Sequence, residues 1–313
     1  MLEAEHLTKY YGSFPAIRDI TFSVERGEIL GFLGPNGAGK TTTMRILTCF
    51  MPASEGTARV AGFDIFEQSL EVRKRIGYLP ESVPLYREMP VKAYLNFVAE
   101  VKGVPRRERA RRVQECMEQC GIADRAGWLI GNLSKGLRQR VGLTQALVHN
   151  PEVLILDEPT LGLDPRQIVE IRQLIRGLGR ERTVILSTHI LPEVSMVCDR
   201  VIIINEGRLV AVDTPENLTL KLQEFSKVRL EVKGPHSEVI ETLGRVDGVV
   251  SVVQEDKPDD ELGTYLVEFQ KDRDVRNELA RVVTDHRWGL LELALVQISL
   301  EEVFVKLVTE EKE

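Results

Sequence analysis

Long apolar runs and a secretory leader are both missing from this chain of 313 residues. No uninterrupted run reaches the length of about 18 apolar residues that a membrane-spanning helix needs, so we expect none. The first residues also lack a positively charged segment followed by about 7–15 apolar residues, the pattern of a signal peptide. These absences predict a chain that stays in the cytoplasm or at the cytoplasmic side of a membrane.

The chain also has no excess of basic residues and has few cysteines. The net charge is −7, and residues 221–313 hold 13 Lys and Arg against 21 Asp and Glu, so the acidity lies in the last third of the chain. A protein that binds mainly by neutralising phosphates needs a basic excess, so we expect no nucleic-acid partner. The cysteines are too few for a disulfide framework in a chain this long, and we expect buried free thiols at Cys49, Cys116, Cys120 and Cys198.

The length predicts two domains, the first of them an α/β domain over residues 1–220. Short apolar runs at 28–33, 153–156, 183–187 and 200–204 lack strict alternation, which indicates strands of a parallel sheet buried on both faces. Residues 90–122 instead predict two helices separated by the segment 102–109, within a helical subdomain of about residues 85–150. The arginine-rich segment 106–112 fits a solvated helix face, or contact with an acidic partner or lipid headgroups.

A second domain is predicted over residues 227–313, after a helix that begins at Thr214 and Pro215. Strand-like runs at 228–232, 249–253, 264–269 and 289–296 alternate with helical segments in the order βαββαβ, which is typical of a ferredoxin-like α+β domain. A last helix is expected from Ser299, with Glu302 completing a capping box. The domain shows no cluster of reactive residues, so a packing role and a regulatory role both stay open.

The strongest chemical signal is the segment GPNGAGKTT at residues 34–42. It follows a predicted strand and opens a predicted helix, the context that a phosphate-binding loop requires. Glycines let the backbone approach phosphates closely, and amides at a helix N-terminus donate to phosphate oxygens. Lys40 supplies a positive charge, and the Thr41 hydroxyl is suited to Mg²⁺. The expected nucleotide contacts are Gly34, Pro35, Asn36, Gly37, Ala38, Gly39, Lys40, Thr41 and Thr42.

Two acidic residues end the apolar run at 153–156. A carboxylate at the carboxyl end of a buried strand lies where a parallel α/β sheet places its chemistry. We expect Asp157 to hold Mg²⁺ and Glu158 to polarise the attacking water. Taken alone, the pair also fits an ordinary polar turn, but the lysine of the phosphate-binding loop favours the catalytic interpretation.

A further anion site is predicted at residues 132–147, where Ser134 is expected to cap a helix and Gly136 to offer a free amide. One phosphate cannot easily contact both this turn and the phosphate-binding loop of the same chain. A plausible arrangement is two chains head to tail, each offering this turn to the nucleotide of the other. Taken without further context, the pattern favours a simple capped helix.

With these motifs in order, residues 1 to about 220 resemble the ATP-binding subunit of ABC transporters. The loop at 34–42 matches the Walker A motif, and LILDE at 154–158 matches Walker B. The remaining family motifs match YLPE at 78–81 for the Q-loop, LSKGLRQ at 133–139 for the signature, GLD at 162–164 for the D-loop and STH at 187–189 for the switch histidine.

The resemblance implies roles for single residues. Tyr11 would stack on adenine, a contact worth about 1–3 kcal/mol. Asp164, followed by a proline, would cap the helix after the D-loop, and His189 would sense or stabilise the γ-phosphate. Together with the loop residues, Ser134 and Gly136 of a second copy would then close the site.

Two departures from the family pattern affect what the resemblance implies. The signature has Lys135 and Leu137 where LSGGQ is commonest, although Ser134 and Gly136 are kept. Lys135 either adds positive charge near the phosphates or points to solvent. Glu81 stands where the Q-loop usually has glutamine. A carboxylate there can still coordinate Mg²⁺ or order water, but it adds negative charge beside a tetraanionic ligand.

The whole pattern, with its C-terminal βαββαβ domain, is similar to stand-alone ATPase subunits that drive exporters of drugs, lipids or polysaccharides, including gliding-motility-type systems. The resemblance implies ATP and Mg²⁺ as cofactors, a dimer of cassettes, and separate membrane permease subunits at the cytoplasmic face of the cell membrane. The alternative is an ABC ATPase that acts on ribosomes or DNA, but such relatives usually carry two cassettes or long insertions. The transported substrate is not encoded in these motifs.

Overall fold

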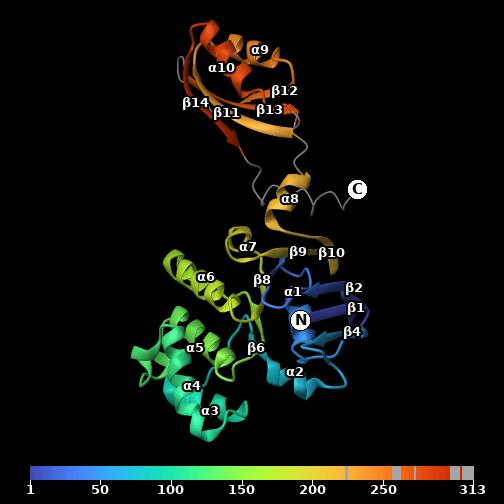
Figure 1. The fold of residues 1–313 in the computed structure, drawn as a ribbon, viewed down its shortest axis with the longest axis vertical. Coiled ribbons are helices and arrows are strands. Elements are labelled where there is room, and N and C mark those ends of the chain that lie inside the picture. Colours follow the sequence, from blue (N-terminus) through green and yellow to red (C-terminus); the bar gives the residue numbers. More distant parts are fainter. Residues whose placement is uncertain (223–224, 256–261, 271–272, 297–303, 305–313) are drawn as a thin grey trace. The chain divides into compact units, whose positions relative to one another are not determined.

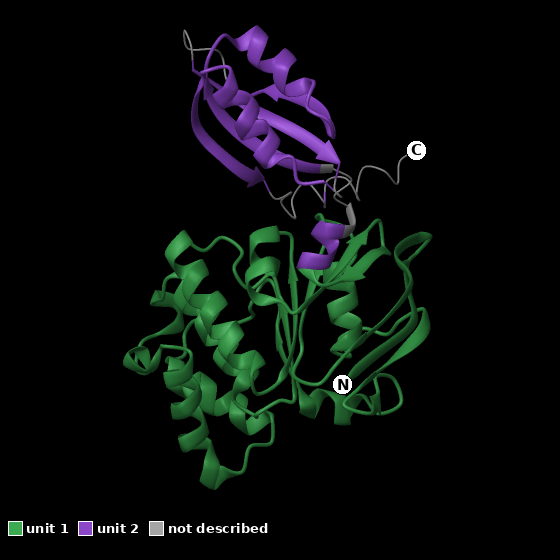
Figure 2. Ribbon diagram, turned by 45° about the horizontal axis from the view of Figure 1, so that its top comes forward, with its two compact units in different colours: residues 1–215 green, residues 216–313 purple. Residues whose placement is uncertain are grey.

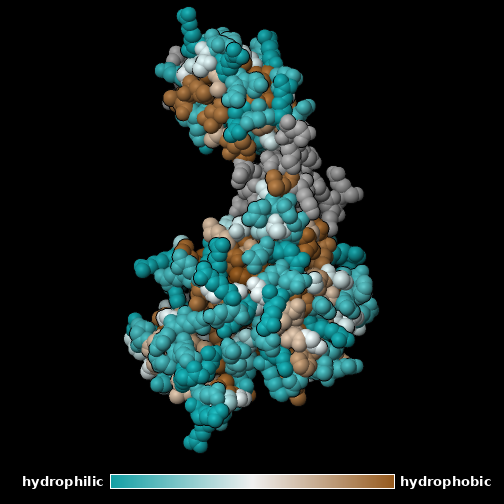
Figure 3. Space-filling view, in the orientation of Figure 1, coloured by the Kyte–Doolittle hydropathy of each residue, from teal (hydrophilic) through white to brown (hydrophobic). Residues whose placement is uncertain are grey.

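A computed structural model describes residues 1–222, 225–255, 262–270, 273–296 and 304. Internal contacts divide the chain into two compact units, residues 1–215 and 216–313 (Figure 2). Among the described residues, no helix is long and apolar enough to cross a membrane. The face seen in Figure 3 is mostly hydrophilic, with scattered apolar patches.

The first unit is built on a six-stranded sheet in the order β10-β9-β3-β8-β7-β6. Its strands are parallel except for β10, and they run over β3 (Ile29–Leu33), β6 (Ile76–Leu79), β7 (Val153–Asp157), β8 (Thr183–Thr188), β9 (Arg200–Asn205) and β10 (Arg208–Asp213). Every residue of β3, β7 and β8 is buried. The predicted parallel sheet, covered on both faces, is confirmed.

A second, antiparallel sheet of this unit was not predicted. Its order is β2-β1-β4-β5, with strands β1 (Leu2–Tyr11), β2 (Phe14–Val24), β4 (Glu55–Val60) and β5 (Phe63–Asp64). Register shifts interrupt the pairing of β1 with both of its neighbours, and these shifts break the alternation of buried and exposed residues that would identify a half-buried strand. Apolar residues of both sheets and of helix α1 (Lys40–Leu47) form one core.

Helices surround this core and form a separate group at one side. Helices α3, α4 and α5 pack against one another in the predicted helical region (Figure 1). The helices of the unit are α1, α2 (Ser69–Arg75), α3 (Val91–Val101), α4 (Arg106–Gln119), α5 (Lys135–Leu147), α6 (Pro165–Gly179) and α7 (Leu191–Val197), with short 3₁₀ turns at Ala123–Arg125 and Ile130–Asn132. Helix α8 (Pro215–Leu222) spans the division between the units.

The predicted separator between the first two helices of this group, residues 102–109, was too long. Helix α4 begins at Arg106, directly after Pro105, so most of the arginine-rich segment is helical. Pro105 takes the N-cap position, and its carbonyl accepts from the Glu108 amide over 2.8 Å. On α4, Arg111 and Arg112 both pair with Glu115, one turn further along the helix.

The second unit is a four-stranded antiparallel sheet in the order β12-β13-β11-β14, which confirms the ferredoxin-like expectation. Its elements are β11 (Phe225–Lys233), α9 (His236–Gly244), β12 (Val249–Gln254), β13 (Leu262–Gln270), α10 (Arg276–Asp285) and β14 (Gly289–Val296). Buried residues of both helices and of β11 and β13 form one core. The helix expected from Ser299 lies outside the described residues. The cysteines of the chain are free and buried, as predicted.

A half-buried histidine of the first unit predicts a pH dependence of stability. Burial, and next the positive charge of Lys102, lower the pKa of His149 to about 4, although its Nε2 donates to the Ile76 carbonyl over 3.0 Å. Between pH 6.5 and 4 the unfolded chain binds a proton at this residue that the folded chain does not. The neutral His149 therefore makes its full contribution to the free energy of unfolding above pH 6.5. As the pH falls to 4, the free energy of unfolding decreases by about 3 kcal/mol in total.

Replacing His149 with glutamine, which keeps an N–H donor for Ile76, should remove this dependence. We expect urea unfolding curves of the wild type to lose stability more steeply between pH 6.5 and 4 than those of the variant. Parallel slopes for the two proteins would contradict the prediction.

Candidate functional site

The phosphate-binding loop joins β3 to α1, as the sequence predicts. Gly39 caps the helix with φ of 107°, and Gly37 has φ of 82°, backbone conformations that other residues rarely adopt. Gly34 is required for space, because a Cβ built there would lie 2.4 Å from the Ile204 carbonyl oxygen. These glycines let the loop turn tightly at the end of β3.

Lys40 opens α1 and is 5% exposed. Its Nζ donates to the carbonyl oxygens of Gly34, at 2.7 Å, and Pro35, at 3.2 Å. The same Nζ lies 3.4 Å from Oε1 of Glu158. The lysine thus holds a positive charge between the loop and the carboxylate of Glu158, the residue that follows β7.

Asp157 is fully buried at the end of β7, where two hydroxyls donate to its Oδ1. One is Thr41 Oγ1, at 3.2 Å, and the other is the hydroxyl of Ser187. The second oxygen, Oδ2, has no hydrogen-bond partner among the described residues. A buried carboxylate oxygen without a donor, beside the threonine of the loop, is a donor set that suits a hard cation such as Mg²⁺.

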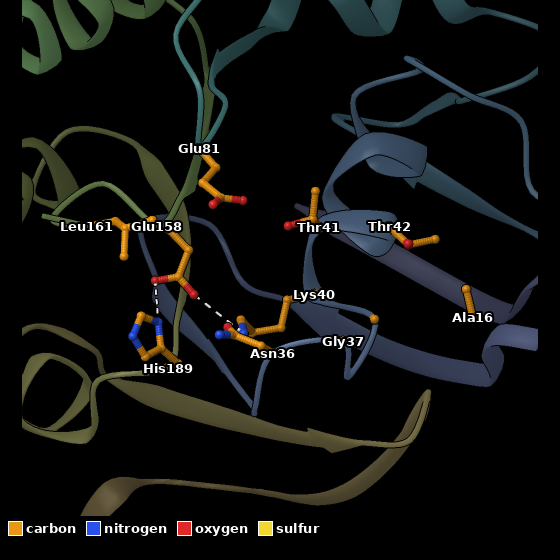
Figure 4. A pocket seen from close by; sticks show the side chains of 11 residues that line it. Ala16, Asn36, Gly37, Lys40, Thr41, Thr42, Glu81, Glu158, Leu161 and His189 are labelled. Atoms are coloured by element: carbon orange, nitrogen blue, oxygen red, sulfur yellow. Dashed lines mark hydrogen bonds and ion pairs between the residues drawn. The ribbon is translucent and has the colours of Figure 1, made fainter.

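Within the described residues, no group of three or more His, Cys, Asp or Glu side chains could hold a metal by itself. Mg²⁺ commonly binds through one or two protein groups together with substrate phosphates and water, so the pair of Thr41 and Asp157 fits this cation. Glu81 also lines the same pocket, opposite Thr41 (Figure 4).

Glu158 is the centre of the site (Figure 4). Its Oε2 lies 2.9 Å from Nδ1 of His189, its Oε1 faces Lys40, and the residue is 5% exposed. Its φ of 50° is left-handed, which for a non-glycine residue costs about 1–3 kcal/mol. The backbone N–H of Glu158 donates to the Ser187 carbonyl over 3.0 Å and so helps to hold this conformation. Glu158 and His189, which the sequence marks separately as candidate catalytic residues, are therefore in contact.

A pocket of about 360 Å³ contains these groups. It is lined by Ala16, Asn36, Gly37, Gly39, Lys40, Thr41, Thr42, Glu81, Glu158, Leu161 and His189. Sequence reasoning missed Ala16 and Leu161, because neither has a side chain whose chemistry suggests a role. Four other predicted site residues do not line this pocket: Gly34, Pro35, Ala38 and Asp157.

Tyr11 does not line this pocket. It ends β1, is 46% exposed, and its Oη donates to Met51 Sδ over 3.2 Å. Its predicted stacking on adenine stays a prediction.

The signature and D-loop residues also lie outside the pocket of their own chain. Ser134 caps α5 and accepts from the Leu137 amide at 3.3 Å, as predicted. Asp164 caps α6 and accepts from the Gln167 amide at 2.9 Å. Gly136 is buried against Gln167, because a Cβ built there would lie 2.5 Å from the amide oxygen of that side chain. The starts of α5 and α6 are thus close together and capped.

The side chain of Lys135 is exposed, and its Nζ lies against Gly162 of the D-loop. It therefore neither lines the pocket of its own chain nor extends freely into solvent. Lys135 instead adds a positive charge beside the two helix N-termini that begin α5 and α6.

Comparison with known proteins agrees with this geometry. The sequence pattern that defines the ABC transporter family matches residues 17–161. The linearmycin resistance ATP-binding protein LnrL of Bacillus subtilis (strain 168) is 32% identical over 98% of both chains. The bacitracin transport ATP-binding protein BcrA of Bacillus licheniformis is 32% identical over 98% of this chain and 97% of its own. A solved ATP-binding subunit of an ABC transporter superposes with a TM-score of 0.65 at 30% identity, over 71% of this chain and 92% of that one.

This chain contains the phosphate-binding loop, the buried carboxylates at the end of β7 and the histidine that follows β8. Its relatives named as ATP-binding proteins match it over almost its full length. This chain belongs to the ATP-binding subunits of ABC transporters, and it is the ATP-hydrolysing part of such a system.

Proposed function

We propose that hydrolysis takes place in the pocket above β7, with Glu158 as the general base. The observation that carries this proposal is the position of the Glu158 carboxylate, which lies between the Lys40 ammonium and the His189 ring and borders the pocket. A carboxylate so placed can accept the proton of a water that attacks the γ-phosphate.

The surrounding residues bind and orient the nucleotide. Lys40 and the amides of residues 34–42 hold the phosphates, and Tyr11 stacks on adenine. Mg²⁺, held by Thr41, Asp157 and Glu81, would neutralise charge on the phosphate oxygens. His189 keeps Glu158 in its orientation through the contact of 2.9 Å and stabilises the γ-phosphate.

We further propose that two copies of the chain close over two ATP molecules. Ser134, Gly136 and Asp164 of one copy would complete the pocket of the other, since all three lie outside their own pocket. The capped start of α5, with Lys135 beside it, presents amide groups and a positive charge to an anion.

The relatives named for linearmycin resistance and bacitracin transport support export as the direction of transport. We propose that this chain powers the export of a compound of a similar kind through separate permease subunits, from the cytoplasmic face of the membrane. A role on ribosomes or DNA finds no support among these relatives.

The permease would dock at a groove of about 430 Å³ beside the Q-loop. The groove is lined by Arg45, Phe50, Tyr78, Pro80, Ser82, Pro84, Val98, Lys102, Gln145 and Ala146. Apolar side chains form most of this lining, and Phe50 is 71% exposed at its rim. An apolar groove with a few polar groups is suited to hold a short helix of a partner.

Replacing Phe50 with serine tests this docking. We expect the tagged wild type to copurify with a polytopic membrane protein, at near-equal stoichiometry, from detergent-solubilised membranes. The variant should bind ATP as the wild type does but should not copurify with this membrane protein. Phe66 offers a matched control, because it is 77% exposed and lies outside the groove. Phe66→Ser should keep the partner.

Equal recovery of the membrane protein with both phenylalanine variants would reject the groove as the docking site. Recovery of the wild type without any membrane protein, and with ribosomes or nucleic-acid enzymes instead, would reject the transport proposal.

A further inference from the structure

Glu193, in helix α7, is a carboxylate to which no motif assigns a role. It is 1% exposed, and both of its oxygens accept hydrogen bonds. Oε1 accepts from the hydroxyl of Thr160, and Oε2 accepts from Oγ1 of Thr188 at 2.8 Å. A buried carboxylate is costly unless it is paired and hydrogen-bonded, so its position is strictly defined by these partners.

The two threonines lie close in sequence to the proposed catalytic groups, Thr160 in the loop that follows β7 and Thr188 as the last residue of β8. Thr160 lies two residues after Glu158, and Thr188 immediately precedes His189. A single carboxylate therefore connects the loop that follows β7 to the carboxyl end of β8, with one oxygen directed to each. The distance between Glu158 and His189 depends on how this loop and this strand end lie relative to each other.

The rest of the network holds Glu193 in place. The guanidinium of Arg172, on α6, lies 3.4 Å from Oε1 and supplies the opposite charge. The backbone N–H of Glu193 donates to the Ile190 carbonyl over 3.1 Å, and the Thr188 hydroxyl also accepts from the Ile190 amide at 3.0 Å. The carboxylate thus bonds the residue just before His189, and the backbone of Glu193 bonds the residue just after it.

We propose that Glu193 is a positioning residue for ATP hydrolysis, which holds Glu158 and His189 at their contact of 2.9 Å. This inference rests on the proposed roles of those two residues. Glu193 touches neither the pocket nor Lys40, so it acts on hydrolysis and leaves the binding of ATP to the phosphate-binding loop.

The test is Glu193→Gln, a change that keeps the size of the side chain and removes its charge and one of its two acceptor oxygens. Misplacement of a catalytic group by about 1 Å can cost about 100-fold in rate, and we expect kcat to fall by at least about tenfold. The KM for ATP should stay within about twofold of the wild type, because the phosphate-binding loop is unchanged.

A second readout does not depend on hydrolysis. The chain has five histidines, and the ring ¹⁵N resonances of His189 can be assigned by comparison with a His189→Gln variant. We expect Glu193→Gln to shift these resonances, because the hydrogen bond that the His189 ring donates to the Glu158 carboxylate changes. Thr160→Val and Thr188→Val each remove one arm of the network at nearly constant volume, and each should lower kcat by less than Glu193→Gln.

Thr144→Val is the matched control. Thr144 is fully buried, and its hydroxyl donates to the Arg140 carbonyl at 2.7 Å, far along α5 from its capped start. We expect this variant to retain the wild-type kcat and the wild-type His189 resonances.

Unchanged kcat and unchanged His189 resonances in Glu193→Gln would overturn the inference. So would an equal loss of kcat in Thr144→Val, since that would indicate a general loss of folded protein. If Glu193→Gln does not fold, Thr160→Val and Thr188→Val test the inference by the same two measurements, kcat and the His189 resonances. Failure of the proposed function is recognised separately, by wild-type hydrolysis in Glu158→Gln, while the resonance shift still reports on Glu193.

Discussion

Glu158→Gln is expected to bind ATP and hydrolyse it about 10²–10⁴-fold more slowly than the wild type, the range attributed to a general base. Glutamine has nearly the same size, but its amide cannot take the proton of the attacking water. The contacts of Lys40 with the loop carbonyls do not depend on this carboxylate, so nucleotide binding should persist. The measurement is phosphate release under saturating ATP and Mg²⁺, with nucleotide binding determined in parallel.

The same variant should accumulate as an ATP-bound dimer. Removing the negative charge of Glu158 relieves repulsion toward the γ-phosphate, and without hydrolysis the closed state has no route to opening. Light scattering after size-exclusion chromatography should therefore show twice the monomer mass with ATP and Mg²⁺ present, and monomer without ATP.

Glu206 provides the matched control, because it is a second glutamate with a left-handed backbone, at φ of 45°, and it is exposed in the turn between β9 and β10. Glu206→Gln should hydrolyse ATP as the wild type does. If Glu158→Gln retained the wild-type rate, Glu158 would not be the base, and the proposed mechanism would be wrong.

Lys40→Ala should lose most of its affinity for ATP. Hydrogen bonds from a charged group are worth about 1.5–3 kcal/mol each, so the loss of one or more contacts to phosphate raises the Kd by at least about 10–100-fold. Isothermal titration calorimetry with ATP and Mg²⁺ measures this change directly.

The substitution also leaves the buried carboxylate of Glu158 without the cation 3.4 Å away, so the folded state is destabilised as well. Thermal unfolding must show that the variant is folded at the temperature of the titration. Lys74→Ala, at an exposed lysine paired with Glu71, should keep both stability and affinity. An unchanged Kd in folded Lys40→Ala would contradict the assignment of the phosphate-binding loop.

The parts of the site that lie within one short segment could be predicted from the sequence. Residues 34–42 contain their own turn, helix start and cation, so their pattern and their structure agree. The caps at Ser134 and Asp164 are equally local, because each bonds an amide three residues away. The parallel sheet could also be predicted, since its buried strands appear in the sequence as continuous apolar runs.

Contacts between distant segments could not be predicted in the same way. Glu193 lies 33 residues from Thr160, and nothing in either local pattern indicates that they meet. Ala16 reaches the pocket only because the hairpin of β1 and β2 packs beside α1. The register shifts of β1 similarly hide the antiparallel sheet from any search for regular alternation.

The order of strands in the large sheet has a consequence for the folding of the chain. Strand β8 lies between β3, which leads to Lys40, and β7, which leads to Glu158. These two strands make no hydrogen bonds with each other, so they cannot be aligned until residues 183–188 have entered between them. During synthesis, a nascent chain that already contains the phosphate-binding loop and Glu158 therefore has no assembled catalytic site. Pairings over such a large sequence separation form slowly, so we expect ATPase competence to be among the last properties that this unit acquires as it folds.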